Sequence, residues 1–408
     1  MLIENLKRIA FYSLAGVILS LSFSISLYEV TSVIFVLSAA AAMILSRDTR
    51  LLKSRWMIFL LLYLAANLLS LTQSHYPIDS LKGIVRVLRL GLLSLGVIYI
   101  IDSEEKFTKI FKWSLLVGFL IALDGLVQGF TGFELIRQRE MTAYALNAGR
   151  VTASFRHAND FSAYLTLLIF FFVGVAAEAK NLKLSPRQLI FVAAGSLALL
   201  GCLFWTYCRG AWVGVAAAFF LFSIFKRKKM LLAFLAVLLL WAGFFSPPIL
   251  QDRLRSLWDP KNGTITERKV LMGESLSMIQ TSPWLGLGLN TFSDNAPLYK
   301  SKTNRTDVQY VHNGFLQMTV ETGVVGLAAF LCLLLFFLVS TLPVFFKKVP
   351  GRLEVGGAAL VFGVIAFLIH SLTDTNLHSL LLVSNFWLCM GLALAAAALV
   401  NPKKFYSA

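Results

Sequence analysis

Composition assigns this chain of 408 residues to the integral membrane proteins. Apolar residues make up 58% of the sequence and charged residues only 14%, and these proportions exclude an ordinary soluble domain. The formal net charge of +16 would also suit a nucleic-acid-binding protein, but most of the excess falls in short loops between apolar runs, where anionic lipid and the membrane potential account for it. We therefore expect membrane lipid among the partners, and no nucleic acid.

Apolar runs of about 17 to 25 residues, long enough to cross roughly 30 Å of hydrocarbon, recur along the whole chain. We expect an all-α integral membrane protein in which about twelve transmembrane helices form a single polytopic domain over residues 1–408. The fourth run is the weakest, because Arg86 and Arg89 fall in its first turns. The predicted spans are Phe11–Leu27, Val30–Leu45, Trp56–Leu71, Ile84–Ile101, Trp113–Phe130, Phe161–Ala177, Gln188–Tyr207, Gly210–Phe225, Met230–Pro247, Val324–Phe346, Val355–His370 and Leu381–Val400.

The positions of the basic residues predict how the chain crosses the membrane. With the N-terminus inside, more than half of the 37 Lys and Arg residues fall in cytoplasmic loops, and the short outward loops near Glu29 and Thr373 hold none. This bias follows the positive-inside rule, so both termini should face the cytoplasm. The first run lacks a convincing small-x-small cleavage site at Phe23–Leu27, and we expect it to remain as a helix.

The other basic residues face outward or lie in the outer half of the membrane, where topology does not require them. Arginine outnumbers lysine in this set, and its planar guanidinium grips phosphate in a bidentate manner. The set therefore indicates an anionic substrate that approaches from outside. Its members are Lys82, Arg86, Arg89, Arg137, Arg139, Arg150, Arg156, Arg209 and the Lys and Arg residues between Arg253 and Arg305.

Two outward loops are long enough to carry part of a site. The larger covers residues 249–311 and the smaller runs from Thr131 to Ala158. An amphipathic run after Thr266 predicts a helix within the larger loop, and Pro283 ends it. We expect this large, partly helical loop to carry part of the active site.

The sequence shows no pattern for a metal site or a cofactor. A DxD pair, an HExxH motif, a GxSxG motif and a Gly-rich nucleotide loop are all missing, and Asp374-Thr375-Asn376 only weakly approximates DxD. The cysteines lack the spacing of metal ligands, so we assign no metal, no disulfide and no cofactor. They are Cys202, Cys208, Cys332 and Cys389.

His312 and Asn313 follow a long polar loop and open an apolar helix. Asn313 can cap that helix, which places His312 beside exposed backbone N–H groups and the positive end of the helix dipole. This position disfavours a charged ring, and a neutral imidazole can act as a general base; helix starts also bind phosphate. The alternative is that His312 is an interfacial polar residue that caps a membrane helix.

Three other outward positions carry candidate residues. Arg209 lies in YCRGAWVG, between two apolar runs joined by almost no loop, where the positive-inside rule does not explain an arginine. Arg268 lies on the helix expected within the large loop, and Arg156 and Asn159 precede the sixth span in SFRHANDFSAYL. Each has a simpler interpretation, respectively a topology anchor, a solvated helix residue and an interfacial cap.

The segment that begins at His312 resembles the O-antigen ligases. His312 and Asn313, nine intervening residues, Gly323, two residues and Gly326 match the H-N-x9-G-x-x-G pattern of that family. The pattern is shared by a wider superfamily that includes O-antigen polymerases and other oligosaccharide-handling membrane proteins.

Other segments resemble the same family in the same order. Arg209-Gly-Ala-Trp-Val213 is similar to its R-x3-L element, with valine for leucine, and Arg268 followed by PWLGLGLNTF is similar to its second arginine segment. SFRHANDFSAYL and HSLTDTNLH resemble two further elements, so the resemblance covers about Thr152 to His378. The first five spans match only in hydropathy.

The resemblance implies a GT-C-like glycosyltransferase of the bacterial inner membrane with a periplasmic active site. It would transfer a glycan from undecaprenyl diphosphate to lipid A–core, the donor and acceptor partners. Arg209 and Arg268 would neutralise the leaving diphosphate in place of a metal, and His312 would take the acceptor proton, so that the displacement inverts the anomeric centre. The expected substrate-binding residues are Arg209, Arg268, Arg156, Asn159 and Asn313.

A mechanism with paired carboxylates has little support in the sequence. Glu321 lies nine residues beyond His312, which is the opposite side of a continuous helix at 3.6 residues per turn. We expect Glu321 to be a structural, core-facing residue.

Two other functions stay open. A polymerase would use the same donor but a second lipid-linked glycan as acceptor. No feature of the sequence identifies the acceptor. A lipid-linked oligosaccharide transporter would explain buried charge without chemistry, but neither an inverted repeat nor a matched pair of broken helices, the usual pointers to alternating access, is found in the sequence.

Overall fold

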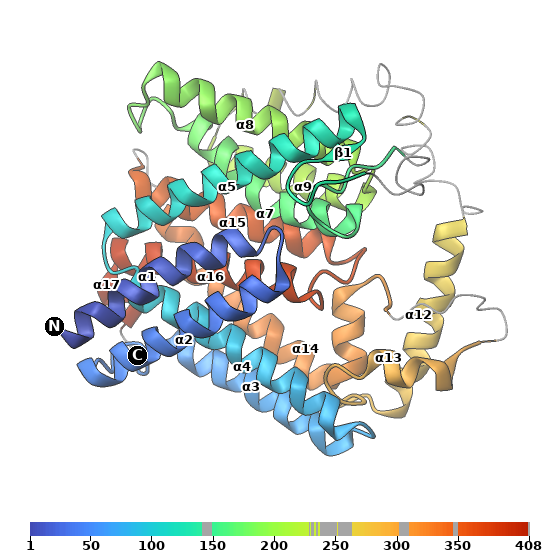
Figure 1. Ribbon diagram of the computed structural model, residues 1–408. Coiled ribbons are helices and arrows are strands. Elements are labelled where there is room, and N and C mark those ends of the chain that lie inside the picture. The colour runs from blue at the N-terminus through green and yellow to red at the C-terminus, as the bar shows by residue number, and fades with distance from the viewer. Residues whose placement is uncertain are drawn as a thin grey trace.

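The computed structural model describes residues 1–140, 149–227, 263–301, 310–345 and 350–406, with a few isolated positions between 229 and 251. In these residues the chain is an all-α integral membrane protein (Figure 1), and nine of their helices are long and apolar enough to cross a membrane. They are α2 (Ile25–Ser46), α3 (Arg55–Ser70) with η1 (Leu71–Gln73), α4 (Pro77–Ile100), α5 (Glu104–Thr131), α7 (Ala158–Ala177), α8 (Pro186–Trp205), α14 (Gly314–Thr341), α15 (Arg352–His370) and α16 (Leu380–Val400).

The remaining elements are shorter or more polar. They are α1 (Leu2–Ser20), a hairpin of β1 (Phe133–Glu134) and β2 (Arg139–Glu140), α9 (Arg209–Phe225), α12 (Gly263–Thr281), α13 (Phe292–Asn295), η2 (Ala296–Tyr299), η3 (Leu342–Phe345) and α17 (Pro402–Tyr406).

Most predicted spans coincide with helices of the structure. The first is misplaced: the helix there begins at Leu2 and ends at Ser20, because Lys7 and Arg8 do not interrupt it and a turn follows Ser20. The predicted span Met230–Pro247 lies outside the described residues apart from isolated positions, so the count of twelve stays a prediction. The large loop is described only over 263–301 and at 310–311 apart from one isolated position, and α12 confirms its expected helix.

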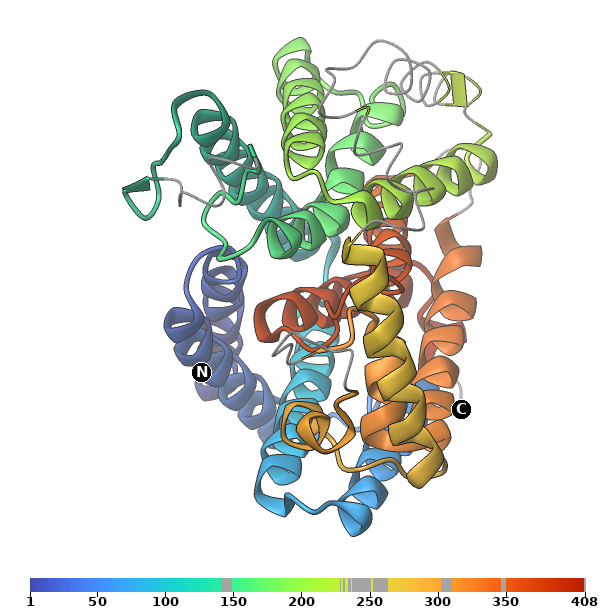
Figure 2. The same ribbon diagram turned by 90° about the vertical axis from the view of Figure 1, so that its right-hand side faces the viewer.

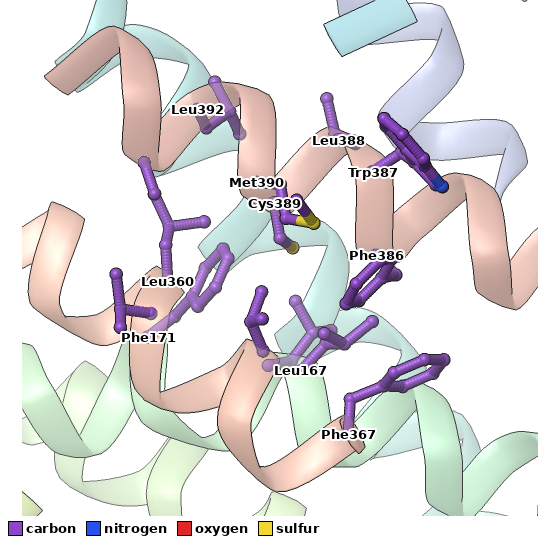
Figure 3. Packing of buried hydrophobic residues seen from close by; sticks show 14 of the residues in the cluster. Leu167, Phe171, Leu360, Phe367, Phe386, Trp387, Leu388, Cys389, Met390 and Leu392 are labelled. Atoms are coloured by element: carbon purple, nitrogen blue, oxygen red, sulfur yellow. The ribbon is translucent and has the colours of Figure 1, made fainter. Parts of the chain in front are cut away.

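The core lies around α7, α15 and α16, which are buried along most of their length. Figure 3 shows Phe171, Leu360 and Phe386 among the side chains packed there. Small residues let the helices approach closely, since a Cβ on Gly363 would lie 2.4 Å from the Leu167 carbonyl oxygen. Lipid tails are as apolar as these side chains, so close packing holds such a bundle together.

The two ends of the bundle differ. The turn after α1 lies near the start of α7, because Ser154 donates a hydrogen bond to the Ser22 carbonyl oxygen. The segment between α15 and α16 lies at this same end, where Asn159 bonds to Asp374. Both chain termini therefore lie at the opposite end. Figure 1 shows α12 and α13 on the side away from them, and in Figure 2 that side faces the viewer.

Helix α14 is broken at Gly323, whose φ of 65° and ψ of −173° are not helical. A positive φ of this kind favours glycine. The break leaves carbonyl and N–H groups on both sides without helical partners. Within a membrane each unpaired backbone group costs several kcal/mol, so other parts of the chain must supply partners.

The segment 283–292 supplies them. A Cβ on Gly323 would lie 2.1 Å from the Trp284 carbonyl oxygen, and a Cβ on Gly286 would lie 2.4 Å from the Glu321 carbonyl carbon, so only glycines permit the contact. The two sequence patterns, PWLGLGLNTF and G-x-x-G, therefore form one structural unit. Four backbone hydrogen bonds join segment 283–292 to α14: Leu287 N–H to Val320 O and Gly288 N–H to Glu321 O at 2.9 Å, Val324 N–H to Pro283 O at 2.9 Å, and Val325 N–H to Trp284 O at 3.2 Å.

We expect Gly323→Ala to destabilise the fold by about 1–3 kcal/mol or more, since the new Cβ adds both a strained positive φ and a clash with backbone. Thermal unfolding of the detergent-solubilised protein measures this. Gly273→Ala is the matched control: nothing lies within 4 Å of its Cβ on α12, and the helix there should be unchanged or more stable. Equal melting temperatures for the two variants would contradict the account of the break.

Candidate active site

A cavity of about 900 Å³ lies at the end of the bundle that carries α13. Its walls come from the start of α7, the residues before α14, and the segment between α15 and α16. Among the residues that the structure describes, its lining includes His312, Arg156 and Asn159. Three of the predicted site residues thus meet at one place. A volume of this size suits a ligand larger than a single sugar.

His312 is held in the cavity wall by its backbone and by two neighbours. Its φ is 58°, and the following residue, Asn313, caps α14 by accepting hydrogen bonds from the N–H groups of Phe315 and Leu316 at 3.1 and 3.0 Å. The predicted cap is confirmed. The Tyr310 ring packs edge-on against the imidazole, with centroids 4.8 Å apart. The side chain of His312 keeps 23% of its surface exposed, so a substrate can reach it.

Asp374 is the acidic partner of His312. Its Oδ1 lies 3.5 Å from His312 Nδ1, slightly longer than a normal hydrogen bond. Burial alone would raise the pKa of Asp374, but the contact with His312, the charge of His370 and the N–H of Thr375 together lower it to about 2. Asp374 is therefore a carboxylate at neutral pH and can orient the imidazole through Nδ1.

A chain of hydrogen bonds fixes this carboxylate. Asn159 Nδ2 donates to Asp374 Oδ2 at 2.6 Å, and Asn159 Oδ1 accepts from Arg150 at 2.6 Å. Arg150 also donates to the carbonyl oxygen of Thr206 at 2.7 Å. Both ends of the Asn159 amide are thus engaged with protein groups, which favours a role in positioning Asp374.

Glu321 lines the same cavity as His312, so the expectation that it lies on the opposite side is wrong. The helical-wheel argument fails because His312 precedes the cap and does not belong to the helix. Glu321 is buried as expected, and its carboxylate accepts the Asn290 N–H at 2.9 Å and lies 3.7 Å from His378 Nδ1. These contacts tie segment 283–292 and the segment before α16 to α14.

Arg209 lies beside the cavity. It is the half-buried first residue of α9, and the next residue, Gly210, packs so closely that a Cβ would lie 2.0 Å from Thr373 Oγ1. Arg209 is therefore adjacent to the segment that carries Asp374. In the described part of the chain, however, the cavity lining does not include it.

Arg268 lies on α12 and is half-buried. Within the described residues its Nε is buried without a hydrogen-bond partner. Its charge acts on His370, at the end of α15, but it too is missing from the described lining. Neither predicted arginine therefore belongs to the described lining, although Arg209 adjoins the segment that follows α15 and the charge of Arg268 acts on the last residue of α15.

Other basic side chains line the cavity directly. They include Arg86, Arg139 and Arg150 besides the predicted Arg156. The pKa of His157 is lowered by partial burial and by the neighbouring charges of Arg156 and Arg150. Sequence analysis placed Arg86, Arg139 and Arg150 in the outward basic set that indicates an anionic substrate, without naming them as site residues. Their convergence on one cavity with Arg156 favours an anionic ligand.

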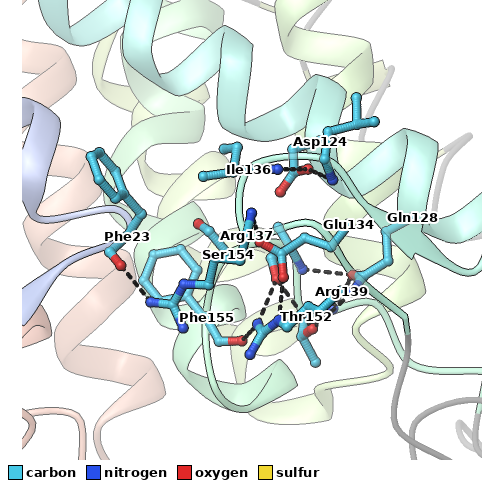
Figure 4. Close-up of polar contacts among 12 residues, drawn as sticks. Phe23, Asp124, Gln128, Glu134, Ile136, Arg137, Arg139, Thr152, Ser154 and Phe155 are labelled. Atoms are coloured by element: carbon cyan, nitrogen blue, oxygen red, sulfur yellow. Dashed lines mark hydrogen bonds and ion pairs between the residues drawn. The ribbon is translucent and has the colours of Figure 1, made fainter.

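A polar network holds the wall before α7 in place (Figure 4). The buried carboxylate of Glu134 pairs with Arg139, and Arg139 donates to the Phe155 carbonyl oxygen at 2.7 Å. The side-chain oxygen of Gln128 accepts the Thr152 N–H at 2.8 Å. The hairpin and α5 therefore support the residues that reach the cavity.

Asp374 and Tyr310 are site residues that sequence analysis missed. Tyr310 has a raised pKa because of burial and the charges of Asp374 and Asp160, so its hydroxyl stays protonated and can donate a hydrogen bond. An acidic residue directly after a membrane span, as in HSLTDTNLH, was the available signal for Asp374. In the described ranges, groups of three or more His, Cys, Asp or Glu that could hold a metal are not found.

The lowered pKa of Asp374 predicts a pH dependence. Its folded value of about 2 lies below the ordinary value of 3.8, so the carboxylate stabilises the fold above about pH 4, and this contribution is lost between about pH 4 and 2. Asp374→Asn should lower the free energy of unfolding by about 2 kcal/mol at neutral pH. It should also remove most of the pH dependence of that free energy between about pH 4 and 2. Acid unfolding in detergent tests this against Asp79→Asn, whose exposed partner is Lys82. Parallel curves for wild type and Asp374→Asn would contradict it.

Comparison with known proteins bears on this site. Residues 194–331 match the family model described as O-Antigen ligase, a segment that contains Arg209, Arg268 and His312. The teichuronic acid biosynthesis protein TuaE of Bacillus subtilis (strain 168) is 22% identical over 342 residues, which cover 77% of this chain and 67% of the relative. The resemblance is therefore confirmed: residues 194–331 of this multi-pass membrane protein match the model of a family whose members are ligases and polymerases of the membrane glycosyltransferase type.

Proposed function

We propose that this chain is an O-antigen ligase that transfers a glycan from undecaprenyl diphosphate to lipid A–core at the periplasmic face of the inner membrane. The observation that carries the proposal is His312 beside Asp374 in a large cavity at the end of the bundle opposite both termini. If the termini are cytoplasmic, as the basic loops predict, that cavity faces the periplasm.

The proposed reaction is a single displacement at the anomeric carbon. The acceptor hydroxyl oxygen attacks that carbon, the bond to the diphosphate oxygen breaks, and the diphosphate leaves with the electron pair. Because His312 Nδ1 faces Asp374, Nε2 is available to take the hydroxyl proton. Attack from the face opposite the leaving group inverts the anomeric centre.

Arginine neutralises the leaving diphosphate in this proposal. Arg268 has a buried Nε without a hydrogen-bond partner in the described residues, so its guanidinium can donate a hydrogen bond to a bound anion. Arg209 lies beside the segment that carries Asp374, and Arg156 lines the cavity itself. With these charges the reaction needs no metal ion. Asn159 and Asn313, which already bond to protein groups, would act by positioning Asp374 and His312.

A polymerase that joins two lipid-linked glycans is the second candidate. The relative whose printed name refers to teichuronic acid biosynthesis is consistent with either candidate, because that name specifies no acceptor. Both candidates share the donor and the proposed base, and they differ in the acceptor.

The lipopolysaccharide profile of a deletion strain tests the function. Loss of all ladder bands with accumulated lipid-linked glycan supports the ligase, and a single-repeat band supports the polymerase instead. Accumulation on the inner leaflet would point to a transporter and contradict both. Transfer by the purified protein in the presence of EDTA tests the metal-independent mechanism.

We expect His312→Ala to insert and fold normally but to lose transfer by roughly 10²- to 10⁴-fold, the usual contribution of a general base. His75→Ala is the matched control, since His75 is an exposed histidine between α3 and α4. Turnover of undecaprenyl-diphosphate glycan by the purified variants measures the effect. Near-native turnover by His312→Ala would contradict the role of His312 as general base.

We expect Arg209→Ala and Arg268→Ala each to slow single-turnover transfer by roughly 10²- to 10³-fold, as for loss of a group that stabilises developing charge. Lysine should substitute poorly, because it lacks the planar fork. The double alanine variant should lose less than the sum of the two single losses in transition-state free energy, since both residues act on one diphosphate. Strictly additive losses would assign the two arginines to separate sites. Full activity of a lysine variant would contradict a bidentate contact at that position.

A further inference from the structure

A second groove, of about 430 Å³, lies between α5, α7, α8 and α15. Apolar side chains such as Phe107 and Phe111 form much of its lining. Three basic side chains, Lys112, Lys183 and Arg352, also line it, and they come from three separate parts of the chain. Among the described residues that line the groove, none is acidic.

The groove lies at the end of the bundle that holds the termini. Val175 lines the groove and Asn159 lines the cavity, and the two residues are on the same helix, α7. A helix rises 1.5 Å per residue, so they are separated by roughly 24 Å, close to the thickness of the hydrocarbon layer. The groove is therefore distinct from the candidate active site and faces the other membrane surface.

In the described part of the chain, none of the three basic residues forms an ion pair. Glu105, one turn from Thr108, pairs with Lys109 at 2.7 Å, and Glu354, in the first turn of α15, accepts the Gly351 N–H at 3.0 Å and caps that helix. The groove thus combines an apolar lining with positive charge.

A second observation indicates a polar ligand atom. Thr108 lines the groove, and its hydroxyl oxygen is buried without a hydrogen-bond partner in the described residues. Buried hydroxyl groups in proteins nearly always have a partner. Arg352 is also the first residue of α15, a helix of 19 residues whose positive dipole end favours a phosphate.

We propose that this groove binds an anionic phospholipid of the inner leaflet. The phosphodiester would lie among Lys112, Lys183 and Arg352, and an acyl chain would lie along Phe107 and Phe111. A soluble phosphate compound would not need the apolar lining, whereas a lipid uses both parts. The site is independent of the proposed transfer reaction.

Native mass spectrometry of the full-length protein in mild detergent tests the proposal, with dioleoylphosphatidylglycerol and dioleoylphosphatidylcholine as probes. Wild type should retain the anionic lipid in preference to the zwitterionic one. The triple variant Lys112→Gln, Lys183→Gln, Arg352→Gln should lose about 100-fold in apparent affinity for it, from the usual contribution of each basic residue beside anionic lipid. Lys183→Gln alone, which changes an exposed loop, should lose about five-fold.

The matched control is Arg8→Gln, Arg47→Gln, Lys53→Gln. It removes the same charge from the same end of the bundle but outside the described lining of the groove, and it should keep wild-type retention. Thr108→Val, which changes no charge, should weaken retention several-fold. Equal retention of both lipids by wild type, or equal losses in the two triple variants, would overturn the proposal in favour of a diffuse attraction to the surface.

Discussion

The broken start of α14 is the constraint on which the rest of the site depends. A backbone group at membrane depth must be paired, and the break at Gly323 frees groups that only segment 283–292 satisfies in the described structure. That segment follows α12 directly, so the same hydrogen bonds tie the helix of Arg268 to the helix that begins after His312. Backbone pairing therefore fixes the position of segment 283–292 against α14.

A similar dependence operates at the first residue of α14, nine residues before the break. The Gly314 N–H donates to the carbonyl oxygens of Ser371 and Asp374, so the segment after α15 completes the start of α14. This contact brings the Asp374 carboxylate to His312, and Asn159 holds it from the side of α7. Three separate parts of the chain must fold correctly before the imidazole has its partner, which explains why the site lies where their ends meet.

Local patterns in the sequence predicted some of this and could not predict the rest. The Asn313 cap depends on a few adjacent residues, and most spans depend on hydropathy, so both were predictable. The prediction for Glu321 assumed a continuous helix that includes His312. The positive φ of His312 shows that this residue lies outside the helix, so the prediction was wrong. The pairing of His312 with Asp374 joins residues far apart in the chain, and hydropathy carries no information about which helix ends meet.

The weakest predicted span shows how a departure from hydropathy can mark a site. Arg86 and Arg89 lie about one turn apart on α4, and an arginine in a membrane helix is costly without a partner. Arg89 pairs with Glu29 and lies over the ring of Tyr28. Arg86 forms no ion pair in the described part of the chain and instead lines the cavity with His312. In the proposed function an anionic substrate in the cavity would compensate this charge, so the arginine that makes α4 a weak membrane span would contribute to binding.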